Sequence, residues 1–446
     1  MFKGRKFVVK RESVPKKRAD ILERIIKKHG GVICEDVNES DVIVAASPMK
    51  AKRDNVVSPE YISRCVEEKA LLPMQPFLLL MPQTTEAIVE KSAEKTDSEA
   101  EEGQHKSSYV CLKSCVLNGP NEDVVKQLSV IKNHRYVTGN PRSELSYSKA
   151  ISGLRALPHR IRAGERVPGI GPKISAYVRA FLETGEMPEV RELEESEEYE
   201  ALNLFCQVYG VGPKHAREFY MRGWRRPEDI SAVELTPLQQ IGAKYYRDFM
   251  ESMTRQECEG VMQVVREFAS DCKVEAMGGF RRGKELSNDL DLFITHPRKE
   301  PRDLCRELIS KLTSAGCIAH ILVQTTSSPL NKKRHHHSTY EEDDLEKCFV
   351  VWNGRDRMHR VDFIFPAQEL YAYAVLGWTG SRQFERSLRL FSSRERGWKL
   401  TSTGVFSART GQRINVEGYL GRPVREESDI FEALGIPYKA PEERNC

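Results

Sequence analysis

Residues 278–297 read GGFRRGKELSNDLDLFITHP, a glycine-rich basic turn followed by a strand-like run that carries two aspartates. In the run DLDLFIT the acidic and apolar residues alternate, and alternate side chains of a strand share one face. We therefore expect Asp289 and Asp291 on one face, about 6 to 7 Å apart, with Leu290 and Leu292 packed behind them. The strand-like periodicity, which begins at about residue 274, predicts a sheet around this run.

A third carboxylate lies in the apolar run RVDFIF at residues 360–365, where Asp362 is the only acid. Three converging carboxylates can hold a pair of Mg²⁺ ions, which two-metal sites keep about 3.5 to 4 Å apart. Hard oxygen ligands and a polyphosphate substrate favour Mg²⁺ over zinc. Arg360 shares a face with Asp362 and is expected to orient it or to lower its pKa. The predicted catalytic and metal-binding residues are Asp289, Asp291 and Asp362.

The glycine-rich turn before the aspartates offers unshielded backbone N–H groups and several cations to a triphosphate. A pair of acids alone is usually a solvated surface feature, but the pair and the turn together indicate nucleotidyl transfer. Arg282 is the predicted direct contact to the triphosphate. The residues predicted to bind the nucleotide here are Gly278, Gly279, Phe280, Arg281, Arg282, Gly283, Lys284, Ser287 and Asn288.

The chain has 446 residues and a net charge of +4, and it is long for one domain because domains usually contain about 100 to 200 residues. Residues 84–105 hold seven acids and two lysines with little apolar material, which is typical of a linker. The eleven cysteines are scattered without a CxxC pair, which argues against a disulfide framework or a zinc ribbon and favours a reducing compartment. No apolar run reaches the roughly 20 residues that span a bilayer, so we expect no membrane segment.

Two segments beyond this linker repeat one pattern, VPGIGPK at 167–173 and VYGVGPK at 208–214. In each, a Gly-x-Gly turn precedes an amphipathic helix, so that backbone N–H groups and the helix N-terminus favour a phosphate. Both segments resemble helix-hairpin-helix motifs, and the alternative is a purely structural turn between helices. The predicted DNA contacts are Gly169, Gly171 and Lys173 in the first motif and Val208, Tyr209, Gly210, Val211, Gly212 and Lys214 in the second.

The first 83 residues predict a small α/β sandwich. The pair Gly30-Gly31, the run DVIVAA at 41–46 and the run VVSPEYISRCVEEKALLP at 56–73 follow in an order that resembles a BRCT domain. Tyr61 stands where that family usually has Trp. The resemblance implies a module that recruits partners, here end-joining proteins, and the alternative is a domain with a folding role only.

Three runs, GGFRRGKELSNDLDLFITHP, RVDFIF and GWTGSRQFERSLRLFSSRERG (377–397), together resemble the family X DNA polymerases, from about residue 106 to the final PEERNC. The resemblance implies a nuclear monomer that acts on DNA ends or gaps and on dNTP or rNTP. It implies two Mg²⁺ ions, with Mn²⁺ as an alternative, and a monovalent cation at the hairpins. The implied multidomain α+β fold consists of a BRCT sandwich at 1–83, a flexible acidic linker at 84–105, a helical lyase-like domain at 106–190, fingers at 191–250, a nucleotidyltransferase palm sheet at 251–369 and an α+β thumb at 370–446.

Gly377 and Trp378 stand where template-faithful members carry an aromatic pair that crowds the sugar 2′ position. The Gly-Trp pair resembles the branch of polymerase mu and terminal deoxynucleotidyltransferase and implies weak discrimination between ribo- and deoxynucleotides. The alternative is a glycine kept for close helix packing. The polar loop at 326–346 also fits this branch, although Asp344 stands where the branch often has His. The further residues predicted at the nucleotide are Gly377, Trp378, Thr379, Gly380 and Arg382.

Arg382, Arg386 and Arg389 fall at i, i+4 and i+7, on one face of a predicted helix. We expect this face to contact the nucleotide and DNA, with Arg386 and Arg389 on the DNA. The alternative is an exposed, ion-paired face, because Glu385 and Arg389 are also i, i+4 partners.

Position 177 bears on a second activity of the family, the removal of a 5′-deoxyribose phosphate. A lyase needs a lysine with a depressed pKa to form a Schiff base, and in the family that lysine lies four positions after the lysine of the first hairpin. In this chain the residue four positions after Lys173 is Tyr177. We therefore predict no such lyase activity.

The sequence favours a template-dependent polymerase that adds nucleotides to primer 3′ ends in gap filling and end joining of double-strand breaks. Template-independent terminal transfer is the second interpretation. A repair scaffold with a vestigial catalytic site is the third, and the presence of all three aspartates argues against it. A template-free RNA nucleotidyltransferase would explain the aspartates but not the paired hairpins.

Overall fold

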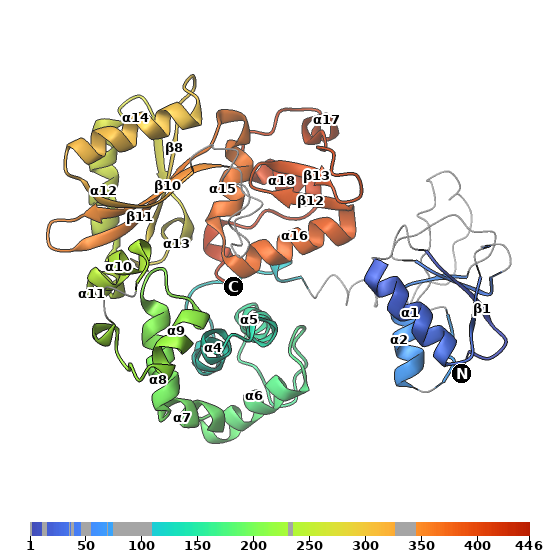
Figure 1. The fold of residues 1–446 in the computed structure, drawn as a ribbon. Coiled ribbons are helices and arrows are strands. Elements are labelled where there is room, and N and C mark those ends of the chain that lie inside the picture. Colours follow the sequence, from blue (N-terminus) through green and yellow to red (C-terminus); the bar gives the residue numbers. More distant parts are fainter. Residues whose placement is uncertain are drawn as a thin grey trace. The chain divides into compact units, whose positions relative to one another are not determined.

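The computed structural model describes residues 2–10, 16–34, 36, 40–45, 55–68, 70–74, 109–230, 235–325 and 345–446. The predicted linker at 84–105 and nearly all of the predicted loop at 326–346 lie outside the described residues. The chain divides into two compact units, Met1–Glu94 and Lys95–Cys446, which are drawn in Figure 1. Within the described ranges, no helix is both long enough and apolar enough to cross a membrane.

In its described residues, the first unit is a parallel sheet with two helices. The strand order is β2-β1-β3-β4, and every neighbouring pair is parallel. All three residues of β3 are buried, as expected for a parallel strand that is covered on both faces. Tyr61 fills the core and donates a hydrogen bond from its hydroxyl to the Leu72 carbonyl at 3.1 Å. The elements are β1 (Lys6–Val9), α1 (Lys16–Lys28), β2 (Val32–Ile33), β3 (Val42–Val44), β4 (Val56–Val57) and α2 (Glu60–Glu67).

The second unit begins with helices, and proline sets many of their starts. Five of these helices have Pro at one of the first two positions, where the fixed φ is helical and the missing N–H costs no hydrogen bond. Their apolar faces form two cores, one around α4 to α7 and one around α8 and α9. The helices are α4 (Glu122–Val137), α5 (Pro141–Arg155), α6 (Pro172–Thr184), α7 (Pro188–Glu194), α8 (Glu197–Gln207), α9 (Pro213–Met221), α10 (Pro237–Lys244) and α11 (Tyr246–Met250).

A five-stranded sheet follows, in the order β6-β8-β11-β10-β9. Only β8 and β11 pair in parallel among these strands. One face packs on α12 and α14, and the other packs on α15, as can be followed in Figure 1. The elements are β5 (Met253–Thr254), α12 (Arg255–Phe268), β6 (Lys273–Ala276), α13 (Gly278–Arg281), β7 (Leu286–Ser287), β8 (Leu290–Thr295), α14 (Pro301–Ser314), β9 (Ile318–Gln324), β10 (Glu346–Asn353) and β11 (Met358–Phe365).

The last part of the chain mixes helices with a short hairpin, and its core includes side chains from far upstream. Tyr109, Cys111 and Cys115 pack in the same core as Phe384 and Phe431. The predicted lyase-like domain therefore starts with a segment that packs on the predicted thumb. The elements are α15 (Tyr371–Thr379), α16 (Arg382–Arg396), β12 (Trp398–Thr401), β13 (Gly404–Ser407), α17 (Val416–Leu420) and α18 (Glu427–Leu434). These helices and sheets confirm the predicted multidomain α+β class.

Candidate active site

Strand pairing brings two of the predicted aspartates together. In the parallel pair β8–β11, Asp291 lies directly opposite Asp362. Leu292 and Phe363, one residue further along each strand, are buried in the core under α12 and α14, so the aspartates face the other way. Asp289 precedes the first residue of β8 by one position and is not itself in the strand.

Arg360 holds the third carboxylate on the same face. Its guanidinium pairs with the Asp289 carboxylate and lies 5.2 Å from the centroid of the Tyr209 ring. Arg360 is therefore the ion-pair partner of Asp289 and acts on Asp362 only through its charge, which opposes the rise in that pKa. The expectation that Arg360 would orient Asp362 itself is not met, because its side chain is engaged by Asp289 across the strand pair.

The three carboxylates lie close enough to repel one another, and all three are partly buried. Burial and the charges of Asp289 and Asp362 raise the pKa of Asp291 well above its ordinary value. Burial and then the charge of Asp289 raise the pKa of Asp362 to about 7. Arg360 is one countercharge for this cluster, but the raised pKa values show that it does not balance all three carboxylates, and a divalent cation would supply the rest.

The donor set fits a hard divalent cation, since it consists of carboxylate oxygens. Among the described residues, no three His, Cys, Asp or Glu side chains already stand in position to hold a metal ion. Asp289 is directed to Arg360. Only the Oδ2 oxygen of Asp289 is paired with Arg360, so Asp289 would bind a cation through its other oxygen or by exchanging its arginine partner for the ion.

The glycine-rich turn is a single helical turn, α13, rather than the tight turn expected from its two glycines. Gly278 has a φ of +56°, and a Cβ there would lie 2.1 Å from the Asp291 carboxylate oxygen Oδ2. Glycine is therefore required where the turn passes the aspartate. Gly279 faces Lys284 and Ser287, to which a Cβ would approach within 3.2 and 3.7 Å.

Both arginines of this turn contact the C-terminal part of the chain. Arg281 donates hydrogen bonds to Thr379 Oγ1 at 2.6 Å and to Glu427 Oε1 at 2.7 Å. Arg282 donates to the Thr379 carbonyl at 2.5 Å and to Asn445 Oδ1 at 3.1 Å. The two cations predicted to meet a triphosphate are thus occupied by protein acceptors in this structure.

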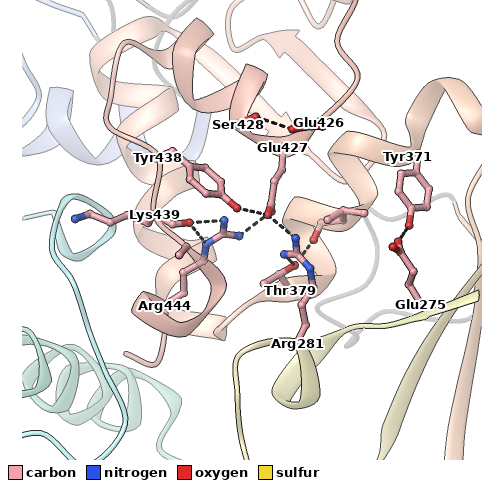
Figure 2. Close-up of polar contacts among 12 residues, drawn as sticks. Glu275, Arg281, Tyr371, Thr379, Glu426, Glu427, Ser428, Tyr438, Lys439 and Arg444 are labelled. Atoms are coloured by element: carbon pink, nitrogen blue, oxygen red, sulfur yellow. Dashed lines mark hydrogen bonds and ion pairs between the residues drawn. The ribbon is translucent and has the colours of Figure 1, made fainter. Parts of the chain in front are cut away.

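Glu427 and Arg444 extend the contacts of Arg281 into a buried network, shown in Figure 2. Arg444 is fully buried and donates to Glu427 Oε2 at 2.8 Å and to the Lys439 carbonyl. Burial alone would raise the pKa of Glu427, but Arg444 and Arg281 lower it below its ordinary value. Figure 2 also shows the Tyr438 hydroxyl directed at Glu427, with a hydrogen bond of 2.8 Å.

Sequence reasoning missed Glu427, Arg444 and Asn445. Charged residues in a polar stretch usually lie at the surface, and one sequence gives no sign that these three are buried. For Arg444 and Asn445 the available signal is that they stand in the run PEERNC, which carries part of the family resemblance.

Gly377 has a packing reason of its own. A Cβ at this position would lie 2.6 Å from Ser402 Oγ, in the turn between β12 and β13. The alternative that this glycine allows close packing of α15 is therefore supported by a contact. Trp378 packs edge-on against Phe293, with ring centroids 6.2 Å apart.

The joint between α15 and α16 lies against Arg282. Thr379 is fully buried, and a Cβ on Gly380 would come 3.0 Å from the Arg282 guanidinium. Arg382 and Arg386 are exposed on α16, and Arg389 is half-buried. Glu385 is 7% exposed, so it is not a surface ion-pair partner of Arg389, although the face that carries Arg382 and Arg386 is exposed.

The two glycine-rich hairpins have the same backbone geometry. Gly169 and Gly210 have φ values of +87° and +84°, and Gly171 and Gly212 cap helices α6 and α9. Lys173 and Lys214 are exposed at these helix starts. Gly169, Gly171 and Lys173 line a cavity of about 480 Å³ together with residues of α5. The other predicted contacts differ, because Val208 and Val211 are buried in the core and Tyr209 lies under Arg360.

Position 177 carries no amine and is engaged elsewhere. The Tyr177 hydroxyl donates a hydrogen bond to Glu189, which also pairs with Arg135. Burial and then Glu189 raise the pKa of Tyr177. The side chain is therefore part of the packing between α6 and α7.

Five family models match successive parts of the chain. They are a BRCT domain at residues 1–78, a helix-hairpin-helix domain at 119–187, the fingers domain of DNA polymerase lambda at 203–250, the DNA polymerase beta palm at 252–367 and the DNA polymerase beta thumb at 374–445. The three aspartates, α13 and the β8–β11 pair lie within the palm match. The BRCT interpretation of the first unit and the hairpin interpretation of residues 167–173 are thereby confirmed, and residues 208–214 lie in the fingers match.

Whole-chain relatives agree with these matches. The DNA nucleotidylexotransferase of Ambystoma mexicanum is 30% identical over 375 residues, which cover 76% of this chain and 71% of the relative. The human DNA nucleotidylexotransferase is 29% identical over 369 residues, covering 76% and 70%. The human DNA-directed DNA/RNA polymerase mu is 29% identical over 365 residues, covering 76% and 72%. With its palm, fingers, thumb and hairpin domains, and a BRCT domain in front of them, the chain belongs to the family X DNA polymerases.

Proposed function

We propose that this nucleotidyltransferase is a DNA-directed DNA polymerase that extends primer 3′ ends in gap filling and in non-homologous end joining of double-strand breaks. The observation that carries the proposal is the strand register that sets Asp291 opposite Asp362, with Asp289 one residue before the same strand. Asp289 and Asp291 would hold both of two Mg²⁺ ions, and Asp362 would hold the ion beside the primer hydroxyl. When bound, Mg²⁺, or Mn²⁺ in its place, lowers the pKa of that hydroxyl and stabilises charge on the departing pyrophosphate.

The protein groups have separate tasks in this proposal. Arg360 releases Asp289 and stays under the carboxylates, where its charge limits their repulsion. Arg282 leaves Thr379 and Asn445 and turns to the triphosphate, because a phosphate oxygen is a stronger acceptor for a guanidinium than a neutral carbonyl. Gly278 and Gly279 leave the backbone N–H groups of α13 open to the same phosphates.

Arg281 takes a different part from the one predicted. Its two hydrogen bonds end on the buried Glu427 and Thr379, and Glu427 is shared with Arg444. We propose that Arg281 holds α13 to α15 and α18 and so fixes the place of the triphosphate, whereas Arg282 contacts the triphosphate itself.

Template-independent terminal transfer is the second candidate, favoured by the similarity to the DNA nucleotidylexotransferases. A primer-extension assay separates the two, with a gapped duplex compared with a single strand and dNTP compared with rNTP. Extension of the gapped duplex alone supports the first proposal, and equal extension of both supports the second. Failure to extend either substrate with Mg²⁺ or Mn²⁺ contradicts both and supports the scaffold interpretation.

The remaining parts of the proposal concern partners and location. The exposed Lys173 and Lys214 would contact DNA phosphates at the two hairpins. The BRCT domain would recruit end-joining proteins, and the protein would act in the nucleus. The domain boundaries stay as predicted from the sequence. Co-precipitation with the full chain and with Met1–Glu94 removed tests recruitment, because only the full chain should retain the end-joining proteins.

A further inference from the structure

A short C-terminal segment, residues 444–446, lies beside the segment that opens the second unit. Cys115 and Arg444 form an isolated parallel bridge. The Cys115 N–H donates to the Glu443 carbonyl at 2.7 Å, and the Cys115 carbonyl accepts from the Asn445 N–H at 2.9 Å. Cys446 follows Asn445 directly, so it lies beside Cys115 in the core that both side chains share, and each thiol influences the pKa of the other.

The surroundings of the two thiols differ in a way that suits thiol chemistry. The hydrogen bond from Cys446 lowers the pKa of Cys115 in spite of burial, and the charges of Arg155, Lys113 and Lys439 act in the same direction. The thiolate is the reactive form of cysteine. By contrast, burial raises the pKa of both Cys305 and Cys348, which lie in the palm core.

The same C-terminal segment touches the nucleotide turn. Asn445 accepts from Arg282 Nε at 3.1 Å and donates from Nδ2 to the Arg282 carbonyl, also at 3.1 Å. Ser381, at the joint between α15 and α16, donates its N–H to the Arg444 carbonyl at 3.2 Å and its hydroxyl to the Cys446 carbonyl at 3.1 Å. Whatever fixes residues 444–446 therefore also fixes the acceptor that holds Arg282.

We propose that Cys115 and Cys446 form a reversible disulfide under oxidising conditions, which fastens the C-terminal segment and keeps Arg282 on Asn445. In this state Arg282 is less free to turn to a triphosphate. The bond itself is independent of what the enzyme does, whereas its effect on nucleotide binding rests on the proposed function. A reversible bond of this kind agrees with the reducing compartment expected from the scattered cysteines, because disulfides there are transient.

The oxidant is a small disulfide such as oxidised glutathione. The Cys115 thiolate attacks one glutathione sulfur, forms a mixed disulfide and expels one glutathione thiolate. Cys446 then gives up its proton and attacks the Cys115 sulfur, which expels the second glutathione thiolate. Two electrons pass to glutathione, and the two protons of the protein thiols end on the two glutathione molecules. Because Cys115 is fully buried, the first attack takes place when residues 444–446 detach, a local opening that breaks the hydrogen bonds of Arg444 and Asn445.

Peptide mapping without reduction tests the bond. The full chain is equilibrated with mixtures of reduced and oxidised glutathione, blocked with an alkylating agent, digested and analysed by mass spectrometry. We expect a peptide pair linked through Cys115 and Cys446 that disappears after reduction and in Cys446→Ser, and that persists in the control Cys317→Ser. Absence of this pair while Cys115 is alkylated or carries only glutathione, or a link between Cys115 and Cys111, overturns the proposal.

Two further measurements check the consequence. Oxidation should raise the melting temperature of the wild type by about 3 °C or more and leave that of Cys446→Ser unchanged. In the oxidised wild type the KM for dNTP should rise about fivefold, as expected from the weakening of one hydrogen bond, and reduction should restore it. An unchanged KM in protein that carries the bond contradicts the link to Arg282. Mass spectrometry detects the disulfide, and primer extension by the reduced protein measures polymerase activity. Failure of the disulfide proposal can therefore be distinguished from failure of the proposed function.

Discussion

Glu427 is a buried carboxylate that two arginines share as their ion-pair partner. It is 4% exposed and accepts from both Arg281 and Arg444. Removing one partner of a buried ion pair leaves an uncompensated charge and costs about 3 to 5 kcal/mol. The arrangement therefore makes one side chain responsible for both the stability of the thumb and the place of α13.

Glu427→Ala is expected to lower the free energy of unfolding of the catalytic unit by about 3 to 5 kcal/mol. The matched control is Glu432→Ala on the same helix, because Glu432 pairs with Arg422 at the surface and exposed pairs contribute about 0 to 1 kcal/mol. Urea unfolding of the two variants measures the difference. Equal losses in both variants would show that burial of Glu427 is not what matters.

Glu385 predicts a pH dependence of stability. Burial raises its pKa from 4.5 to about 7, so between these values the folded state holds a proton that the unfolded state has lost. Stability therefore falls as pH rises through this window, by on the order of 3 kcal/mol for this group. Glu385→Gln removes the group, and its unfolding free energy relative to wild type should be higher at pH 8 than at pH 4.5. A constant difference across that range would refute the assignment.

The two palm strands that carry the aspartates were largely predictable, because acidic and apolar residues alternate along them. DLDLFIT and RVDFIF became β8 and β11 with the aspartates on one face, since the apolar partners had to be buried. The helical conformation of the glycine-rich turn was not predicted from the sequence. The sequence indicates where glycines stand, but the close approach of Asp291 to Gly278 is a contact between residues 13 positions apart.

The packing of α15 on the hairpin β12–β13 decides how Gly377 is interpreted. Gly377→Ala would push a methyl group toward Ser402 and is expected to cost about 1 to 3 kcal/mol. Gly377→Ala combined with Ser402→Gly should regain part of that loss, because the contacting oxygen is gone. Thermal unfolding measures both, and the dNTP to rNTP ratio is measured in parallel. A change in sugar preference without loss of stability would favour the open-space interpretation instead.

At the scale of the whole molecule, the net charge is only +4. Two hairpins with the same geometry nevertheless each present an exposed lysine. Their positive-φ glycines and exposed lysines were predictable from the repeat, since a spaced pair of identical patterns is a stronger signal than one. The burial of Val208 and Val211 in the second motif was not predictable, because it results from packing against α8 and α9.

Lys173→Ala and Lys214→Ala are each expected to weaken DNA binding without regard to sequence. Each should lower the slope of log K against log salt by about 0.9 on duplex DNA, the effect of one phosphate contact. Lys311→Ala is the control, since that lysine lies on α14, outside both hairpins; like Lys214, which is 4.0 Å from Glu218, it has a carboxylate neighbour, Glu307. Fluorescence anisotropy over a salt series measures the slopes, and unchanged slopes would remove the hairpins from the DNA interface.

The central claim is that Asp289, Asp291 and Asp362 form the catalytic centre. The most direct test compares Asp362→Ala with Asp356→Ala, an exposed aspartate in the turn before β11, in primer extension on a gapped duplex with Mg²⁺. Asp362→Ala should abolish incorporation while DNA binding stays nearly intact, and Asp356→Ala should behave as wild type. Extension by Asp362→Ala at the wild-type rate would contradict the claim.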